Sequence, residues 1–372
     1  GFERAGSSIT PVLDRLAGEG VVYEAAYSQS GWTLPALTSL LTGRYPVPMK
    51  EEEGSMSWRE AGAHDLPEIM GRYGYQTQAF WGRTLPSVMS RGVSDTFQRV
   101  HILAEDEEPR MQTAEVLEWL REEPAEPFFT LVHDVDLHMP DLALSEEEQH
   151  RFLDGTLRSS ASTYSEMYRE LADLHGAEAA VAYSMARYDA TLGEVDRQIG
   201  AVIEALEEAP LKRDTVVIIT SDHGEDLFVH AHGDHGLLYD TVLHVPLIVL
   251  DPRASSARRV EQTAQTVDLA PTILERAGIP LDEGMVGVPL SRIEDSSAVD
   301  RPVLSMSNGC NISMRTRRHK LVIRDAPGDP STEGLSAWQG GAVQPLVPLH
   351  EVLFRQQLVA LPQPSCTEEV IH

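Results

Sequence analysis

Apolar and polar positions follow two different periods along most of the chain, and their alternation predicts an α/β fold. Short continuous apolar runs are typical of buried strands, and apolar residues that recur every three or four positions mark the buried face of a helix. The predicted strands are Val21–Tyr27, Thr77–Trp81, Phe128–His133, Thr215–Thr220 and Pro246–Leu250. The predicted helices are Pro35–Gly43, Leu66–Tyr73, Met111–Glu122, Glu178–Glu207 and Val267–Ala277. We therefore expect a central, mostly parallel sheet with helices on both faces.

The strongest strand signal is Thr215–Thr220, which is β-branched throughout and apolar on both faces. That pattern is typical of a central strand covered on both sides. The helix Glu178–Glu207 that precedes it has the clearest apolar stripe. The polar stretches Ser145–Phe152 and Tyr164–Leu174 are predicted to be helical and to form an insertion over one face.

The pattern changes after residue 284, which predicts a second, smaller unit. Short strands are expected there at Val303–Met306, Ile312–Thr316 and Lys320–Arg324. We expect one domain over residues 1–284 and a small antiparallel α+β subdomain with an irregular tail over residues 285–372.

Charge and cysteine content restrict the function. The chain has 58 acidic and 30 basic residues, a net charge of −28, which argues against non-specific binding to nucleic acid. Its two cysteines, Cys310 and Cys366, lack the spacing of a zinc site or a redox pair, and a single disulfide between them stays open. The sequence contains no run of 18 apolar residues, so it predicts no membrane-spanning segment. Localisation and oligomeric state are not indicated.

Titratable residues gather where two predicted strands end. Ser-Asp-His-Gly-Glu at 221–225 follows the strongest strand, and adjacent Asp222 and His223 can reach one metal ion at such an end. The alternative is a capped turn. His138 follows the strand Phe128–His133, and three histidines, His230, His232 and His235, lie downstream. We favour a functional role for His235, whereas His230 and His232 also fit a solvated loop.

Thr33 lies just before the predicted helix Pro35–Gly43. A helix N-terminus presents unpaired N–H groups and a partial positive charge, so it binds anions and lowers the pKa of a nearby hydroxyl. Thr33 is therefore a candidate nucleophile. The structural alternative is that its hydroxyl caps the helix.

Several of these segments together resemble the sulfatase family of the alkaline-phosphatase superfamily. Thr33-Leu34-Pro35 with Leu41-Thr42-Gly43-Arg44 matches the frame around the sulfatase nucleophile, and residues 220–225 match the second metal motif. Further matches are residues 244–248, 267–272, 314–316 and 319–321, so the resemblance covers roughly residues 2–325. It implies an alkaline-phosphatase-like three-layer sandwich and a catalytic domain within residues 1–284.

The chain departs from the family pattern at its nucleophile. Sulfatases convert a cysteine or serine to formylglycine, whereas Thr33 cannot yield that aldehyde, and Leu37 replaces the arginine that follows the proline. Relatives that cleave or transfer phosphate esters use threonine. We therefore expect Thr33 to attack a phosphate ester and to bind a metal together with Asp222 and His223.

The remaining expectations concern the rest of the site. The family's first acidic metal ligands have no counterpart here, so we expect the sequence to be an N-terminally truncated fragment. Arg83, near the place of the family's Gly-Lys-Trp-His region, is a candidate for binding the anionic substrate. His138 and His235 are expected to bind substrate oxygens or protonate the leaving group.

Three functions stay open. The favoured one is a metal-dependent hydrolase of sulfate or phosphate esters that prefers phosphoester cleavage or transfer, with one or two Zn, Mn or Ca ions. The alternatives are a sulfuric-ester hydrolase by descent and a catalytically impaired, sulfatase-like binding protein.

Overall fold

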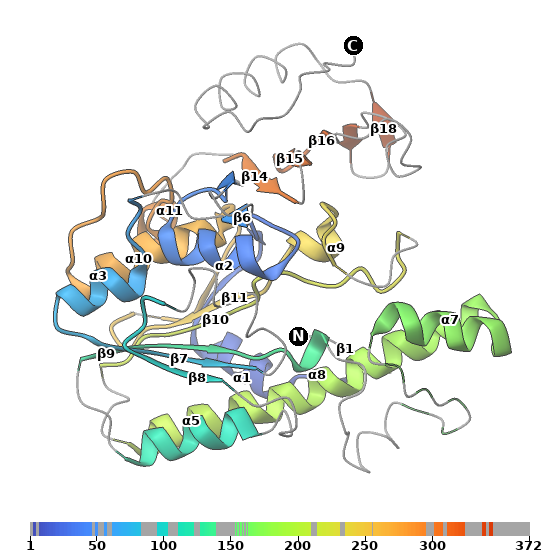
Figure 1. Ribbon diagram of the computed structural model, residues 1–372, viewed down its shortest axis with the longest axis horizontal. Coiled ribbons are helices and arrows are strands. Elements are labelled where there is room, and N and C mark those ends of the chain that lie inside the picture. The colour runs from blue at the N-terminus through green and yellow to red at the C-terminus, as the bar shows by residue number, and fades with distance from the viewer. Residues whose placement is uncertain are drawn as a thin grey trace.

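The chain folds into three layers, with sheets between two layers of helices (Figure 1). This computed structural model describes all residues except 1–2, 5–6, 47–48, 51–55, 58–61, 83–94, 103–110, 123–126, 139–152, 154, 156, 158, 160, 162, 210–213, 231–234, 255, 295–300, 308–310, 324–336, 340–341 and 345–372. Arg83, Cys310, Cys366, His232 and the predicted helix Ser145–Phe152 lie outside the described residues.

Two sheets form the middle layer. A parallel sheet has the order β8-β7-β9, formed by Arg99–Ile102, Gln76–Trp81 and Phe128–His133. A mixed sheet has the order β10-β11-β3-β12, formed by Val217–Thr220, Leu247–Leu250, Val21–Tyr23 and Arg258–Val260. The α/β architecture is thus confirmed, with parallel pairing concentrated in the first sheet.

Strand β10 differs from its predicted central position. It pairs with β11 alone among the described strands, and its residues are half-buried rather than fully buried. Strand β9 likewise pairs with β7 alone in the described part of the chain. Both strands end at the same edge, where the His133 and Asp222 side chains approach within 3.6 Å. An apolar β-branched run predicts a strand. The number of strands that pair with it depends on the whole sheet and cannot be read from the run itself.

Helices cover the two sides of the sheets (Figure 1). On one side lie α2 (Thr33–Thr42), α3 (Leu66–Arg72) and α10 (Leu269–Ala277). On the other lie α1 (Pro11–Glu19), α5 (Met111–Arg121) and α8 (Ala177–Glu208). Strand β7 alternates between the two cores, because Ala79 and Trp81 join the α2 side whereas Phe80 packs with the α5 side.

The remaining elements are short. The predicted strand Val21–Tyr27 is divided by a turn into β3 and β4 (Ala26–Tyr27), and α7 (Tyr164–His175) is confirmed as a helix that packs on α8. The others are β1 (Glu3–Arg4), β2 (Ser7–Ser8), β5 (Met49–Lys50), β6 (Met56–Ser57), η1 (Asp136–His138), α9 (Asp240–Leu243), β13 (Ala264–Gln265), η3 (Thr266–Asp268), α11 (Leu290–Glu294), β17 (Ala337–Gln339) and β18 (Ala342–Gln344). No helix in the described ranges is both long and apolar enough to cross a membrane.

The predicted antiparallel C-terminal strands are confirmed as β14 (Val303–Met306), β15 (Ile312–Arg315) and β16 (Lys320–Ile323). This sheet packs on the main body through polar contacts and through an apolar cluster in which Tyr45 packs against buried residues of β14 and β15. Arg315 and Lys320 both bind the Asp240 carboxylate of α9, at 2.6 and 2.7 Å. The Ser305 hydroxyl donates to the Ser28 carbonyl at 2.7 Å.

Helix α2 lies at the centre of the main apolar core, on the side of the sheets that also carries α3 and α10. Every residue from Thr33 to Thr42 is buried, and Gly43 ends the helix with a left-handed φ of 65°, as its glycine predicts. Leu37 is 2% exposed and lies in the main apolar cluster, so the position where sulfatases carry an arginine is here part of the core. A guanidinium at this position would be buried among apolar side chains.

We expect Leu37→Ala to lower the free energy of unfolding by about 2–5 kcal/mol, because it leaves a cavity under α2. Leu37→Arg should destabilise the fold more, since it buries an unpaired charge. Urea unfolding followed by circular dichroism measures both. Leu174→Ala is the matched control, because Leu174 is 71% exposed and its truncation should change stability by less than about 0.5 kcal/mol. Equal stability of Leu37→Arg and the parent would contradict this account of the core.

Candidate functional site

The Thr33 side chain faces the loop after β10 instead of capping its own helix. Trp32 occupies the N-cap position of α2, no side-chain cap hydrogen bond forms there, and Thr33 is the first helical residue. The Thr33 hydroxyl lies 3.1 Å from Nε2 of His223, and both side chains are buried. The structure therefore does not support the capping role for Thr33.

The direction of this hydrogen bond follows from the other ring nitrogen. His223 Nδ1 lies 3.0 Å from the Gly224 carbonyl oxygen, which can only accept. In the neutral imidazole, Nδ1 therefore carries the proton and Nε2 is the acceptor. The Thr33 hydroxyl then donates to Nε2, so its proton already points at a base.

Gly224 allows the loop to follow this path. A Cβ atom at this position would lie 2.6 Å from the Thr241 carbonyl oxygen, well inside van der Waals contact. The Gly224 N–H donates to the Val242 carbonyl at 2.7 Å. The glycine of the motif thus lets the backbone after β10 pack directly against α9, with His223 directed at α2.

Asp222 completes a first group of ligand atoms. Its Oδ1 accepts from the His223 N–H at 2.9 Å, and its Oδ2 lies 3.5 Å from His223 Nε2 and 3.6 Å from His133 Nε2. Burial raises the pKa of Asp222, but the His223 and His133 imidazoles outweigh burial and hold that pKa well below its usual range. The carboxylate is therefore ionised at neutral pH.

Oxygen and nitrogen atoms of Thr33, Asp222 and His223 thus converge at the carboxyl end of β10, as the motif predicts. Asp222 Oδ2 is buried, and its contacts among the described residues are the imidazole nitrogens of His223 and His133 at 3.5 and 3.6 Å, too long for good hydrogen bonds. It could therefore also bind a cation. This mixed oxygen and imidazole set fits Zn²⁺ or Mn²⁺ better than Ca²⁺, which prefers oxygen ligands alone. His133 was not predicted as a site residue, although its place at the end of β9 is a signal for it.

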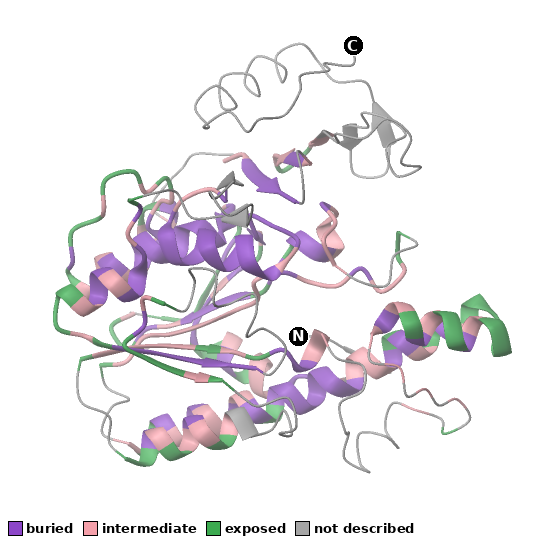
Figure 2. Cartoon of the chain, viewed as in Figure 1, coloured by how far each residue is buried: buried purple, intermediate pink, exposed green. Residues whose placement is uncertain are grey.

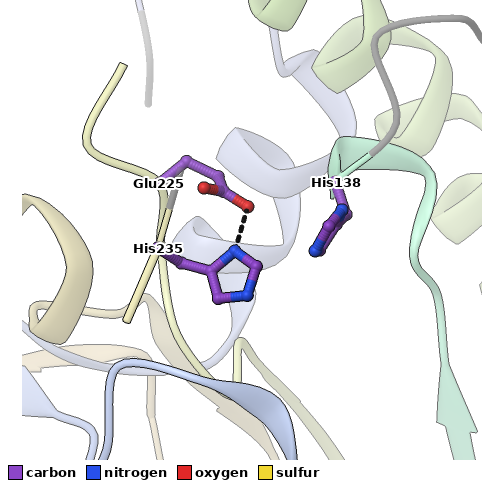
Figure 3. Close-up of side chains that lie close together, drawn as sticks. All are labelled: His138, Glu225 and His235. Carbon is purple, nitrogen blue, oxygen red and sulfur yellow. Dashed lines mark hydrogen bonds and ion pairs between the residues drawn. The ribbon is translucent and has the colours of Figure 1, made fainter. Parts of the chain in front are cut away.

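A second group of side chains lies beside the first and contains His138, Glu225 and His235 (Figure 3). His235 Nδ1 lies 3.1 Å from Glu225 Oε1, and the His138 and His235 rings are 4.7 Å apart between centroids. The His223 ring stacks on the His235 ring at 4.6 Å, so the two groups are in contact through these rings. The structure thus brings together the predicted residues His138, His235, His223 and Thr33.

The turn that carries His138 is stabilised by two hydrogen bonds, one within the turn and one from helix α8. The Asp136 N–H donates to Asp134 Oδ1 at 2.7 Å, and Gln198 of α8 donates to Asp136 Oδ2 at 3.0 Å. Burial is the main cause that lowers the pKa of His138 below its ordinary value, and the nearby His235 and His223 add to this effect. The His138 imidazole is therefore neutral at neutral pH, with its nitrogen lone pair available.

Other polar residues of the segment have structural roles. Asp226 is buried and accepts hydrogen bonds from His230 Nδ1 and the Thr241 hydroxyl, each at 2.7 Å. His230 stacks on Tyr239 at 3.9 Å, so it belongs to the loop scaffold. Leu227 and Phe228 follow with φ of 46° and 67°, a strained conformation for side chains of this size. Phe228 stacks on Tyr168 of α7 at 4.2 Å.

Known proteins resemble the chain in sequence and in fold. Human arylsulfatase K is 23% identical over 363 residues, which cover 82% of this chain and 67% of that protein. A phosphonate monoester hydrolase from Silicibacter pomeroyi has a TM-score of 0.71 at 19% identity, covering 94% of this chain and 90% of that one. A 2-O GAG sulfatase has a TM-score of 0.69 at 17% identity, covering 95% and 86%.

The sequence profile of the family described as Sulfatase matches residues 1–279, and its fold neighbours share the alkaline-phosphatase architecture. Three quarters of the chain thus lie within this match, including Thr33, Asp222, His223, Glu225 and His235. The chain therefore belongs to the sulfatase family and is an ester hydrolase of that family.

Proposed function

We propose that the protein hydrolyses or transfers phosphate esters, with the Thr33 hydroxyl as nucleophile in place of formylglycine. The observation that carries this proposal is the 3.1 Å hydrogen bond from Thr33 to His223 Nε2. A threonine that only shaped the helix would direct its hydroxyl to the backbone, as Thr38 does toward the Leu34 carbonyl at 2.8 Å. Thr33 instead points to the predicted metal ligands.

Each of the three residues has its own role in the proposed reaction. Without an ion, the Thr33 hydroxyl donates to His223 Nε2. When a divalent cation is bound, this nitrogen would bind the cation instead, together with the Thr33 oxygen and the Asp222 carboxylate. When bound, such a cation lowers the pKa of the hydroxyl and offsets negative charge on the substrate. The N-terminus of α2 adds partial positive charge beside the same hydroxyl. The Thr33 oxygen, after its proton is lost, would form a bond to phosphorus while the bond from phosphorus to the leaving-group oxygen breaks, and the leaving group would depart with a proton from solvent. Water would then attack the phospho-threonine, releasing phosphate and restoring the Thr33 hydroxyl.

His235 stacks on His223, and His138 lies next to His235. We propose that these two histidines contact oxygens of the leaving group. Their position supports this role, because the His235 ring stacks on the His223 ring at 4.6 Å between centroids, and the His138 ring lies 4.7 Å from that of His235. We also retain Arg83 as a substrate-binding residue on the grounds of its sequence position. The division into a catalytic domain over residues 1–284 and a C-terminal subdomain over residues 285–372 stays part of this proposal.

A sulfate ester is the second candidate substrate, favoured by the similarity to arylsulfatase K. The chemistry of a threonine nucleophile nevertheless favours a phosphate ester over a sulfate ester as the substrate. Formylglycine hydrate releases sulfate through its second hydroxyl, whereas a sulfated threonine lacks such a route. A phospho-threonine has an electrophilic phosphorus that water can attack directly.

Thr33→Ala should lower kcat/KM for an aryl phosphate mono- or diester by about a hundredfold or more, because the nucleophile is lost. Thr33→Ser should keep part of the activity, since it keeps the hydroxyl. Thr38→Ala, the same change on the same helix, should leave the rate near that of the parent. Kinetics with paired aryl phosphates and aryl sulfates measure these effects. A parent enzyme that prefers the sulfate, or an equally active Thr33→Ala, would refute the proposal.

Asp222→Ala and His223→Ala should each lower the content of bound divalent metal by about one equivalent per chain, because each removes a ligand at the end of β10. Elemental analysis of the purified protein after dialysis against Zn²⁺ or Mn²⁺ gives the stoichiometry. Asp173→Ala is the matched control, because Asp173 is exposed on α7. Full metal content in both site variants would show that these residues are not ligands.

A further inference from the structure

Strand β14 of the C-terminal sheet lies against the segment that leads to Thr33. All four residues of this strand are buried, as Figure 2 shows. The Met306 N–H donates to the Gln29 carbonyl at 2.8 Å, and Met306 also pairs with Ser30 in an isolated parallel bridge. A sheet that lies beyond the family match, which ends at residue 279, thus contacts the backbone next to the proposed nucleophile.

The same sheet contacts the segment that directly follows His235. The Gly236 N–H donates to the Gly31 carbonyl at 2.6 Å, and the Gly236 carbonyl accepts from the Ser307 hydroxyl. A Cβ atom on Gly31 would lie 2.3 Å from the Leu237 carbonyl oxygen, so the two backbones are in direct contact. The segment after His235 is therefore held between the loop before α2 and the C-terminal sheet.

Ion pairs fix the far end of this segment, at Asp240. Arg315 and Lys320 contact the Asp240 carboxylate at 2.6 and 2.7 Å, and these two cationic side chains are only 14% and 11% exposed. The Arg315 guanidinium also lies 4.1 Å from the centre of the Tyr27 ring, in a cation–π contact. Burial raises the pKa of Asp240, but Lys320 and Arg315 outweigh burial and hold that pKa below its usual value. Removal of this charge would leave two largely buried cations next to each other without the carboxylate that they share.

Asp240 is also the first residue of α9, and the next residue connects this helix to Glu225. The Thr241 hydroxyl donates to Asp226 Oδ1 at 2.7 Å, and Asp226 directly follows Glu225 in the chain. Glu225 Oε1 in turn lies 3.1 Å from His235 Nδ1. Both members of the His235–Glu225 pair are thus connected to the start of α9, one through the backbone and the other through a side-chain hydrogen bond.

We propose that Asp240, held by Arg315 and Lys320, is a positioning residue for the His235–Glu225 pair. The C-terminal sheet then fixes the leaving-group side of the active site. This inference rests on the proposed function, in which His235 contacts the leaving group, and deepens it. Loss of the Asp240 charge releases the start of α9 and the segment before it, so the pair shifts, whereas the proposed nucleophile stays in place on the buried helix α2.

The kinetics of two aryl phosphates separate positioning from a general loss of folded protein. Asp240→Asn should lower kcat/KM for phenyl phosphate, a poor leaving group that depends on His235, by about tenfold or more. For 4-nitrophenyl phosphate, which leaves readily, the loss should be only about two- to threefold. A defect that merely reduces the amount of active protein lowers both rates equally. Lys320→Gln, which removes one of the two cations, should give the same selective loss to a smaller extent.

Glu294→Gln is the matched control. It removes a carboxylate charge from the ion pair with Arg258, which joins β12 and α11 away from Asp240. This variant should leave the ratio of the two rates unchanged. Circular dichroism and thermal midpoints verify that each variant is folded, and Lys320→Gln carries the test if Asp240→Asn does not fold.

Nuclear magnetic resonance reports the position of His235 without turnover. Its imidazole signals in ¹H–¹⁵N spectra, assigned by their absence from His235→Gln, should shift in Asp240→Asn and stay unchanged in Glu294→Gln. Folded Asp240→Asn and Lys320→Gln variants that keep the parent signals, or that lose equal fractions of both rates, would overturn the positioning role. The proposed function fails by a different outcome, a preference for sulfate or an active Thr33→Ala. The spectra still test Asp240 in that case, and phenyl and 4-nitrophenyl sulfate then replace the two phosphates.

Discussion

The hydrogen bond between Thr33 and His223 is the contact on which the organisation of this protein depends. It joins the first turn of α2 to the loop after β10, two segments separated by 190 positions in the sequence. On one side of this contact α2 is buried along its whole length, and on the other side Gly224 packs the loop against α9. The apolar core under α2, which includes Leu37, therefore positions the proposed nucleophile, Thr33, as well as stabilising the fold.

Local signals in the sequence were sufficient to predict most elements and to select Asp222 and His223 as candidate ligands. Gly43 predicts the end of α2, the β-branched run predicts β10, and the adjacent Asp222 and His223 predict ligands at its carboxyl end. These features depend on neighbouring residues alone. The same reasoning applies to β14, β15 and β16, whose short apolar runs identify an antiparallel sheet.

Features that depend on distant parts of the chain were not predicted. The pairing of β10 on one side is a property of the sheet, and the pattern of its own residues is the same for a central strand and an edge strand. Glu225 stands in the recognised motif, yet its pairing with His235 and proximity to His138 need the loop conformation after Asp226. Thr33 was predicted as the nucleophile with helix capping as the alternative, and only the folded structure shows that its hydroxyl faces His223 and not the helix backbone.

The central claim is that the Thr33 oxygen forms a covalent bond to the substrate, and trapping that bond tests it most directly. The protein is mixed with an excess of an aryl phosphate, quenched in acid at short times, digested and analysed by mass spectrometry. The account predicts a phosphoryl group on Thr33 that appears before steady state and is absent from Thr33→Ala. Steady turnover with no phosphorylated Thr33 at any quench time would contradict the account and assign the attack to water.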